Sequence, residues 1–263
     1  MTIEATRDAG ALGAYVSGID LSAPLDDATF ETLHSLFLEH HVLCFRDQGH
    51  LTSDQQLAFA ARWGTIFTHP YVPGIEGYPP IMEVHDPHPI TVAWHSDTTH
   101  SKTPPRMTML LARRVPEYGG DTMFANQHLA YEELSDGLKR LLEGLNAVHK
   151  GTELAMKEKG MAISEVSAMH PVVRIHTENG RPAIYVNEDY TKHFEDMTEE
   201  ESRPLLEYLY ATCGRARYTW RHHWRVGDFL FWDNASVQHC VVDDVQKGER
   251  SLHRVLIEGM APA

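Results

Sequence analysis

The sequence has only three cysteines in 263 residues, and no two of them are spaced as CxxC. An odd number of unpaired thiols argues against a disulfide framework and is typical of a reducing compartment. No apolar run approaches the roughly 18 residues that a membrane-spanning helix needs, and the first residues contain no basic segment followed by an apolar one. We therefore expect a cytoplasmic protein with no membrane partner.

Positive charge is also scarce. The 23 Lys and Arg residues face 37 Asp and Glu residues, which gives a formal net charge of −14. The basic residues are scattered and form no electrostatic footprint for a phosphate backbone, so nucleic acid is excluded as an expected partner. An anionic substrate would have to be captured by a local cationic pocket, and individual arginines therefore matter more than the net charge.

The length and the 42% hydrophobic content suit one large domain, and we expect a single domain over residues 1–263. Helical spacing predicts helices over 28–40 and over 129–148, the second broken near 135–137. Capping boxes at Ser53 with Gln56 and at Thr198 with Glu201 predict the starts of two more. Residues 70–90 are rich in Pro and Gly and predict a lid loop, and 150–168 predict a mobile insertion.

Short strands follow one another in the last third of the chain. Residues 218–222 alternate in polarity, and the apolar runs 229–232, 237–242 and 252–257 are separated by turn residues. Strands at such close intervals predict a sandwich or jelly roll with the helices packed outside it.

Eighteen histidines invite a metal hypothesis but also make chance pairings common. His95 and Asp97 form the only HxD, and in an extended segment their side chains fall on one side. His239, which enters an apolar strand just after a turn, is the best candidate for a third ligand. Two imidazoles and a carboxylate leave three open positions on an octahedral ion, which suits ferrous iron better than zinc. The alternative is that these are ordinary structural histidines.

Two arginines lie close to the last predicted strand. Arg250 and Arg254 are four residues apart, so both can point to one face at a separation of about 13 Å. That spacing suits two anions, because each guanidinium offers a planar fork to an oxyanion. The alternative is a surface role in which both pair with Glu249 or Glu258.

Nearly the whole chain resembles the taurine dioxygenase and 2,4-dichlorophenoxyacetate dioxygenase family of iron(II)/2-oxoglutarate oxygenases. The stretches that carry the resemblance are Trp94-His95-Ser96-Asp97, Pro104-Pro105, Gly119-Gly120-Asp121-Thr122, His170-Pro171-Val172-Val173-Arg174, Val186-Asn187-Glu188, Trp232-Asp233-Asn234 with Gln238-His239, and His253-Arg254. The fold that it implies is α+β with a mainly β core, a cupin-like double-stranded β-helix or jelly roll with flanking helices.

The resemblance also implies roles for individual residues. His95, Asp97 and His239 would be the iron ligands, and Thr122 and Arg250 would hold the distal carboxylate of 2-oxoglutarate. The cofactors implied are Fe(II), 2-oxoglutarate as co-substrate, and O2.

Four further positions would contact the substrate: His69, Thr91, Tyr190 and Arg254. Arg254 matches the arginine that holds the anionic group in the taurine and alkylsulfate members. Thr91 stands where the taurine enzyme has an asparagine, and this departure puts taurine itself in doubt.

The activity implied is hydroxylation of a C–H bond in a small anionic molecule, a sulfonate, sulfate ester, carboxylate or aryloxy acid. The reaction gives succinate and CO2, and the hydroxylated product can collapse to a carbonyl compound. Because the carboxylate of Asp97 is intact, hydroxylation is favoured over halogenation. Relatives are commonly dimers or tetramers, so we expect a homo-oligomer. The alternatives are a non-catalytic metal-binding jelly-roll protein and a cupin-like metal hydrolase or isomerase.

Overall fold

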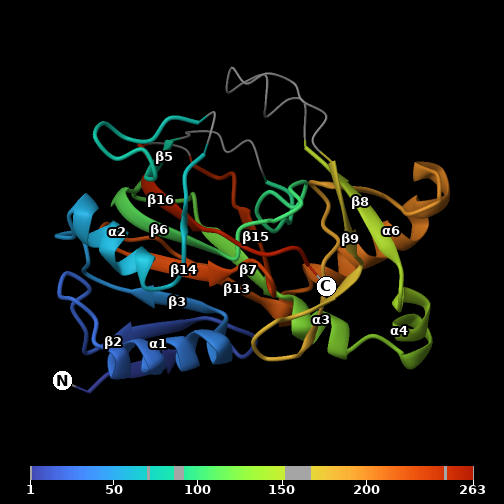
Figure 1. Cartoon of the computed structure of the whole chain (residues 1–263), viewed down its shortest axis with the longest axis horizontal. Helices are drawn as coiled ribbons and strands as arrows, with labels where there is room; N and C mark the ends of the chain where they lie inside the picture. Colours follow the sequence, from blue (N-terminus) through green and yellow to red (C-terminus); the bar gives the residue numbers. More distant parts are fainter. Residues whose placement is uncertain (1, 70–71, 86–91, 152–166, 246–247, 263) are drawn as a thin grey trace.

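Two sheets form the centre of the molecule in the computed structural model, which describes residues 2–69, 72–85, 92–151, 167–245 and 248–262 (Figure 1). The larger sheet has eight strands in the order β1-β2-β3-β14-β6-β16-β4, with β5 pairing on β16. Its strands are β1 Glu4–Arg7, β2 Ala14–Ser17, β3 Val42–Phe45, β14 Phe229–Asp233, β6 Met107–Arg114, β16 Ser251–Ile257, β4 Ile66–Phe67 and β5 Met82–His85.

The smaller sheet has the order β13-β7-β15, and both outer strands run antiparallel to β7. Its strands are β13 Thr219–His222, β7 Thr122–Asn126 and β15 Val237–Val241. Two further sheets flank this core. They consist of β12 Thr191–Phe194, β8 Asn146–Lys150 and β9 Ser167–Pro171, and of β10 Val173–Ile175 with β11 Pro182–Ile184.

The central strands of the larger sheet are buried on both faces. On β14, Phe229 and Phe231 pack into the cluster beneath the N-terminal helices, whereas Leu230 and Trp232 pack between the two sheets. Alternate side chains of a strand point to opposite faces, so a strand covered on both sides must be apolar throughout. This explains why 229–232 is a continuous apolar run, and the predicted jelly-roll core is confirmed.

The helices lie outside the sheets. Helices α1 Asp27–His40 and α2 Ser53–Ala61 cover one face of the larger sheet, and α3 Gln127–Glu132, α4 Asp136–Leu142 and α6 Glu199–Cys213 gather at the other end of the molecule with β8 and β9 (Figure 1). A short 3-10 helix, Ala216–Tyr218, follows α6. The helix predicted over 28–40 and the cap predicted at Thr198 with Glu201 are confirmed.

Two local predictions were wrong. The capping box of α2 is formed by Thr52 and Gln55, one residue before the predicted pair, and the Gln56 side chain instead donates to the carbonyl of His253. Residues 146–148, predicted as helical, form part of β8. There the backbone pairs with both β9 and β12, so tertiary pairing overrides the helical spacing of the apolar residues.

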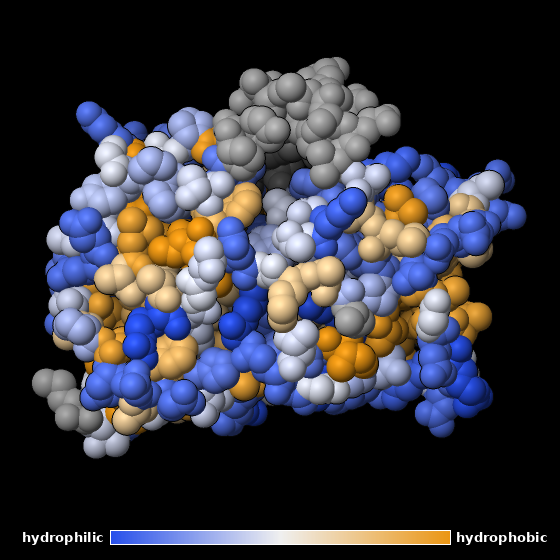
Figure 2. Space-filling view, in the orientation of Figure 1, coloured by the Kyte–Doolittle hydropathy of each residue, from blue (hydrophilic) through white to orange (hydrophobic). Residues whose placement is uncertain are grey.

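The two unpatterned segments fall largely outside the described residues. Of the predicted lid over 70–90, residues 72–85 are described and include β5, whereas of the predicted insertion over 150–168 only the two ends are described, as parts of β8 and β9. Their roles stay predictions. The face seen in Figure 2 carries separate apolar patches divided by hydrophilic residues, and none of the described helices has the length and apolar character needed to cross a membrane.

Acidification is expected to destabilise the fold. Burial lowers the pKa of His41 and His149 to about 3 and that of His128 to about 4, against 6.5 for an exposed histidine. Below pH 6.5 the unfolded chain therefore binds protons that the folded chain does not. As the pH decreases below 6.5, each of these histidines should lower the free energy of unfolding by about 1.4 kcal/mol per pH unit. This loss should continue until the pH reaches the pKa of that histidine in the folded chain.

Denaturant unfolding of the metal-free protein between about pH 7 and pH 5 measures this slope. His149→Gln should make the slope shallower, whereas His50→Gln, at an exposed position, should leave it unchanged. A free energy of unfolding that stays flat over this range would contradict the prediction.

Candidate metal centre and co-substrate site

His95 and His239 are held side by side by the backbone. Each donates its N–H to the carbonyl of the other, at 3.0 and 2.7 Å, and their ring centroids are 4.1 Å apart. Asp97 follows in the turn after His95, and one ligand atom from each of the three side chains lies within 4.8 Å of the others. The structure therefore brings together the three residues predicted as a metal site, and all three are buried.

Hydrogen bonds orient two of these side chains. His95 donates from Nδ1 to the carbonyl of Ala93 at 2.9 Å, which leaves its Nε2 lone pair for a ligand. Thr108 donates to Oδ2 of Asp97 at 2.5 Å and accepts from the side-chain amide of Asn234 at 2.8 Å. The oxygen of Asn234 in turn accepts from the backbone N–H of Asp97 at 3.3 Å. Outer contacts of this kind fix the orientation of metal ligands.

The protonation states also suit a cation. Burial alone would raise the pKa of Asp97, but His239, Arg254 and His95 lower it below its ordinary value, so the carboxylate is ionised at neutral pH. Burial, assisted by His95, lowers the pKa of His239 to about 3 and keeps its imidazole neutral. A metal needs deprotonated ligands, and two imidazoles with one carboxylate form the donor set typical of non-haem iron(II).

Arg250 and Thr122 meet where β7 begins and where the chain enters β16. Arg250 donates from Nη2 to the Thr122 hydroxyl at 3.4 Å and from Nε to the carbonyl of Gly120 at 3.1 Å. Arg250 is only 4% exposed, and Glu249 pairs with Arg114 instead. The alternative of a surface role for Arg250 is therefore wrong.

Trp224 joins this pair. Its indole N–H donates to the Thr122 hydroxyl at 3.0 Å, and the guanidinium of Arg250 lies 5.9 Å from the centre of its ring. Trp224 also packs in the cluster between the two sheets. The continued alternation after Trp220 and His222 was the signal that could have placed it on the inward face.

Arg254 and Tyr190 lie near the proposed metal ligands. The guanidinium of Arg254 lies 3.7 Å from the sulfur of Met82 and acts electrostatically on both Asp97 and His239. The Tyr190 ring is 6.2 Å from that of His95, and burial raises the pKa of its hydroxyl. The alternative that Arg254 pairs with Glu258 at the surface finds no support among the described ion pairs.

The other two residues predicted to contact the substrate are His69 and Thr91. His69 follows β4, accepts from the backbone N–H of Val72 at 2.9 Å and packs against Phe67. Thr91 lies outside the described residues. Their roles stay predictions.

His100 also lies near this site, although the sequence did not predict it there. Its ring lies 5.0 Å from that of Tyr190, and its buried Nδ1 has no hydrogen-bond partner in the described part of the chain. Its position five residues after His95, in the same loop, was the available signal.

A second buried cluster contains side chains that can bind metals, but an arginine lies beside it. Cys44, His222 and Asp228 approach one another within 4.8 Å, but Arg46 forms an ion pair with Asp228 and already supplies a positive charge there. His222 is fully buried while His223 is exposed, so these neighbours do not share a site.

Known proteins share this architecture. The family model described as "Taurine catabolism dioxygenase TauD, TfdA family" matches residues 4–256. An alkylsulfatase of Acinetobacter baylyi is 33% identical over 95% of this chain and 83% of its own. An alpha-ketoglutarate-dependent sulfate ester dioxygenase of Pseudomonas putida is 31% identical over 97% of this chain and 89% of its own.

The crystal structure of a taurine dioxygenase from Burkholderia xenovorans has a TM-score of 0.90 at 31% identity, and the match covers 99% of this chain and 91% of that one. The family model spans almost the whole chain, and it includes both the histidine pair and the arginine site. The chain therefore belongs to the TauD/TfdA family.

Proposed function

We propose that this protein is an iron(II)- and 2-oxoglutarate-dependent dioxygenase that hydroxylates a C–H bond of a small anionic substrate and produces succinate and CO2. One observation carries the proposal: the buried set of His95, Asp97 and His239 occurs in the same fold as the buried pair of Arg250 and Thr122. Neither part alone specifies this chemistry. Together they provide for a metal and for a dicarboxylate co-substrate.

His95, Asp97 and His239 would hold the iron, which when bound supplies the activation of dioxygen. The guanidinium of Arg250 and the hydroxyl of Thr122 would bind the distal carboxylate of 2-oxoglutarate through charge-assisted hydrogen bonds. The indole of Trp224 donates a hydrogen bond to that hydroxyl and would orient it.

The substrate class follows from Arg254. Its guanidinium acts electrostatically on Asp97, His239 and Tyr190, and it can hold a sulfonate, sulfate ester, carboxylate or aryloxy acid. Both relatives described above are named for sulfate ester chemistry. If the hydroxylated carbon carries a sulfur or ether oxygen substituent, the product should collapse to a carbonyl compound.

A succinate-release screen tests the proposed reaction. The iron-loaded protein would be supplied with 2-oxoglutarate and with sulfonates, alkyl sulfates, phenoxy acids or amino-acid derivatives in air. Succinate formation that depends on one of these classes is expected. If succinate forms with none of them, the hydrolase, isomerase and non-catalytic alternatives would be favoured instead.

Replacing Arg254 with methionine is expected to raise the KM for an anionic substrate by about 10- to 100-fold, the loss of a charge-assisted hydrogen bond. The uncoupled turnover of 2-oxoglutarate without substrate should change little, because Arg250 is intact. Steady-state assays of both activities separate the two effects. Arg114→Met, at an exposed arginine on β6, is the matched control, and equal loss of both activities in the Arg254 variant would exclude a substrate role.

Three broader predictions also belong to this proposal. We expect one domain over the whole chain, a cytoplasmic location and a homo-oligomer, either a dimer or a tetramer. Light scattering on the purified protein measures the oligomeric state directly, and a monomer at micromolar concentration would contradict the last of these.

A further inference from the structure

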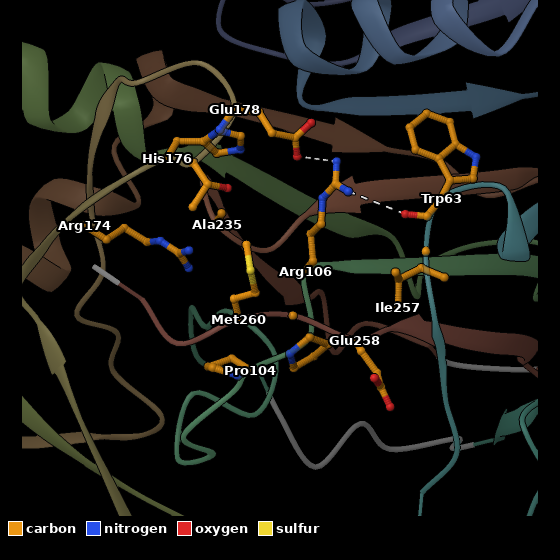
Figure 3. A pocket seen from close by; sticks show the side chains of 14 residues that line it. Trp63, Pro104, Arg106, Arg174, His176, Glu178, Ala235, Ile257, Glu258 and Met260 are labelled. Atoms are coloured by element: carbon orange, nitrogen blue, oxygen red, sulfur yellow. Dashed lines mark hydrogen bonds and ion pairs between the residues drawn. The ribbon is translucent and has the colours of Figure 1, made fainter. Parts of the chain in front are cut away.

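A cavity of about 240 Å³ lies at the end of the jelly roll where β16 finishes (Figure 3). Its walls come from separate segments and include Pro104, Arg106, Arg174, Ala235 and Met260. None of the proposed metal or 2-oxoglutarate residues lines it. It is therefore a separate site from the one described above.

Arg174 is the unusual group in this wall. It is only 8% exposed, its guanidinium lies 4.7 Å from the ring centre of Tyr185, and its buried Nε has no hydrogen-bond partner in the described ranges. No carboxylate forms an ion pair with it among those same residues. A buried arginine without a counter-charge is rare, because removing the charge from water is costly unless an anion compensates it.

The other charged groups of the cavity are engaged elsewhere. Arg106 forms an ion pair with Glu178, and His176 pairs at 2.8 Å with the buried Asp233. Figure 3 shows the carboxylate of Glu258 directed away from the arginine described above. Among the described residues of the cavity, Arg174 therefore carries the positive charge that no carboxylate balances. Its guanidinium lies beside Met260 inside the cavity (Figure 3).

We propose that this cavity binds a small organic anion whose carboxylate, sulfate or phosphate group is held by Arg174. The planar fork of a guanidinium matches two oxygens of such a group. Pro104, Ile257 and Met260 provide an apolar wall for a short hydrocarbon body. A volume of about 240 Å³ suits a compound of a few carbon atoms rather than a nucleotide or a peptide.

Calorimetric titration with butyrate tests the proposal. The protein is loaded with iron(II) and 2-oxoglutarate under argon, so that the Arg250 site is filled, and chloride keeps the ionic strength constant. We expect one saturable binding event per chain in the Arg254→Met background, where the proposed substrate arginine is absent. Arg174→Met should weaken it at least about tenfold, which corresponds to the loss of one charge-assisted hydrogen bond.

Two matched variants locate the binding. Arg215→Met removes an exposed arginine that also stacks on a tyrosine, and should leave the affinity unchanged. Arg254→Met removes the proposed substrate arginine, and butyrate should still bind at the cavity in this variant. If Arg174→Met does not fold, Arg174→Lys keeps the charge without the fork and should still weaken binding.

Sulfate and phosphate are titrated in parallel. Tighter binding of butyrate supports the apolar wall, whereas equal binding of the inorganic ions would overturn the organic part of the proposal. The absence of saturable binding, or equal affinity in the wild type and both Arg174 variants, would overturn the site itself.

Discussion

Replacing Asp97 with alanine is expected to abolish coupled turnover and to weaken iron(II) binding by more than about 100-fold. Losing a contact outside the ligand set typically costs about 10- to 100-fold in metal affinity or activity, so losing a ligand should exceed that range. The metal-free variant is expected to fold. Metal titration by equilibrium dialysis measures the affinity, and circular dichroism confirms the fold.

Thr108→Val provides the matched comparison for this variant. It removes the 2.5 Å hydrogen bond to Asp97 but leaves the carboxylate in place. Its effect on iron affinity should fall within the range of about 10- to 100-fold. Iron affinity that is unchanged in the Asp97 variant would exclude this residue as a ligand.

Replacing Arg250 with methionine should raise the apparent dissociation constant for 2-oxoglutarate by at least about 30-fold. Truncating one partner of a buried, hydrogen-bonded charge pair typically costs about 2–5 kcal/mol, and Arg250 is 4% exposed. Iron affinity measured without 2-oxoglutarate should stay close to that of the wild type, because Arg250 makes no contact with the three proposed ligands among the described hydrogen bonds and ion pairs.

Arg225→Met, at an exposed arginine next to Trp224, serves as the control and should bind 2-oxoglutarate normally. Thr122→Val should have a smaller effect than the Arg250 variant, since a neutral hydrogen bond contributes less than a charged one. An Arg250 variant with unaltered 2-oxoglutarate affinity would mean that the co-substrate binds elsewhere.

The HxD part of the candidate metal centre could be predicted from sequence because its information is local. In an extended segment the spacing of His95 and Asp97 alone places both side chains on one side. The position of His239 at the start of an apolar strand made it a candidate, but only the family motifs implied that it meets the other two, because no local rule brings together residues so far apart in the chain. The structure supplies the backbone bridge between the two histidines.

The contacts that orient the site could not be predicted in this way. Asn234 reaches Thr108 and Asp97 only because β14 and β6 are neighbours in the larger sheet. The contact of His100 with Tyr190 likewise depends on tertiary packing. Sequence patterns report the periodicity of one element, whereas these contacts depend on which elements become neighbours.

The two errors in secondary structure have the same physical origin. Thr52 with Gln55 and Ser53 with Gln56 both satisfy the capping pattern, and only the packing of Gln56 against β16 decides between them. Around β8, Leu142, Leu145 and Val148 continue the helical spacing after α4, yet the backbone is taken up by strands on both sides. In each case non-local pairing selected one of two locally acceptable structures.

Anaerobic absorption spectroscopy tests the central claim most directly. Iron(II) and 2-oxoglutarate added together to the metal-free protein should give a weak visible charge-transfer band that neither produces alone. The band should be lost in Asp97→Ala and should require higher 2-oxoglutarate concentrations in Arg250→Met. A wild-type protein that binds iron but develops no band at saturating 2-oxoglutarate would contradict the assignment of this site to a 2-oxoglutarate-dependent iron dioxygenase.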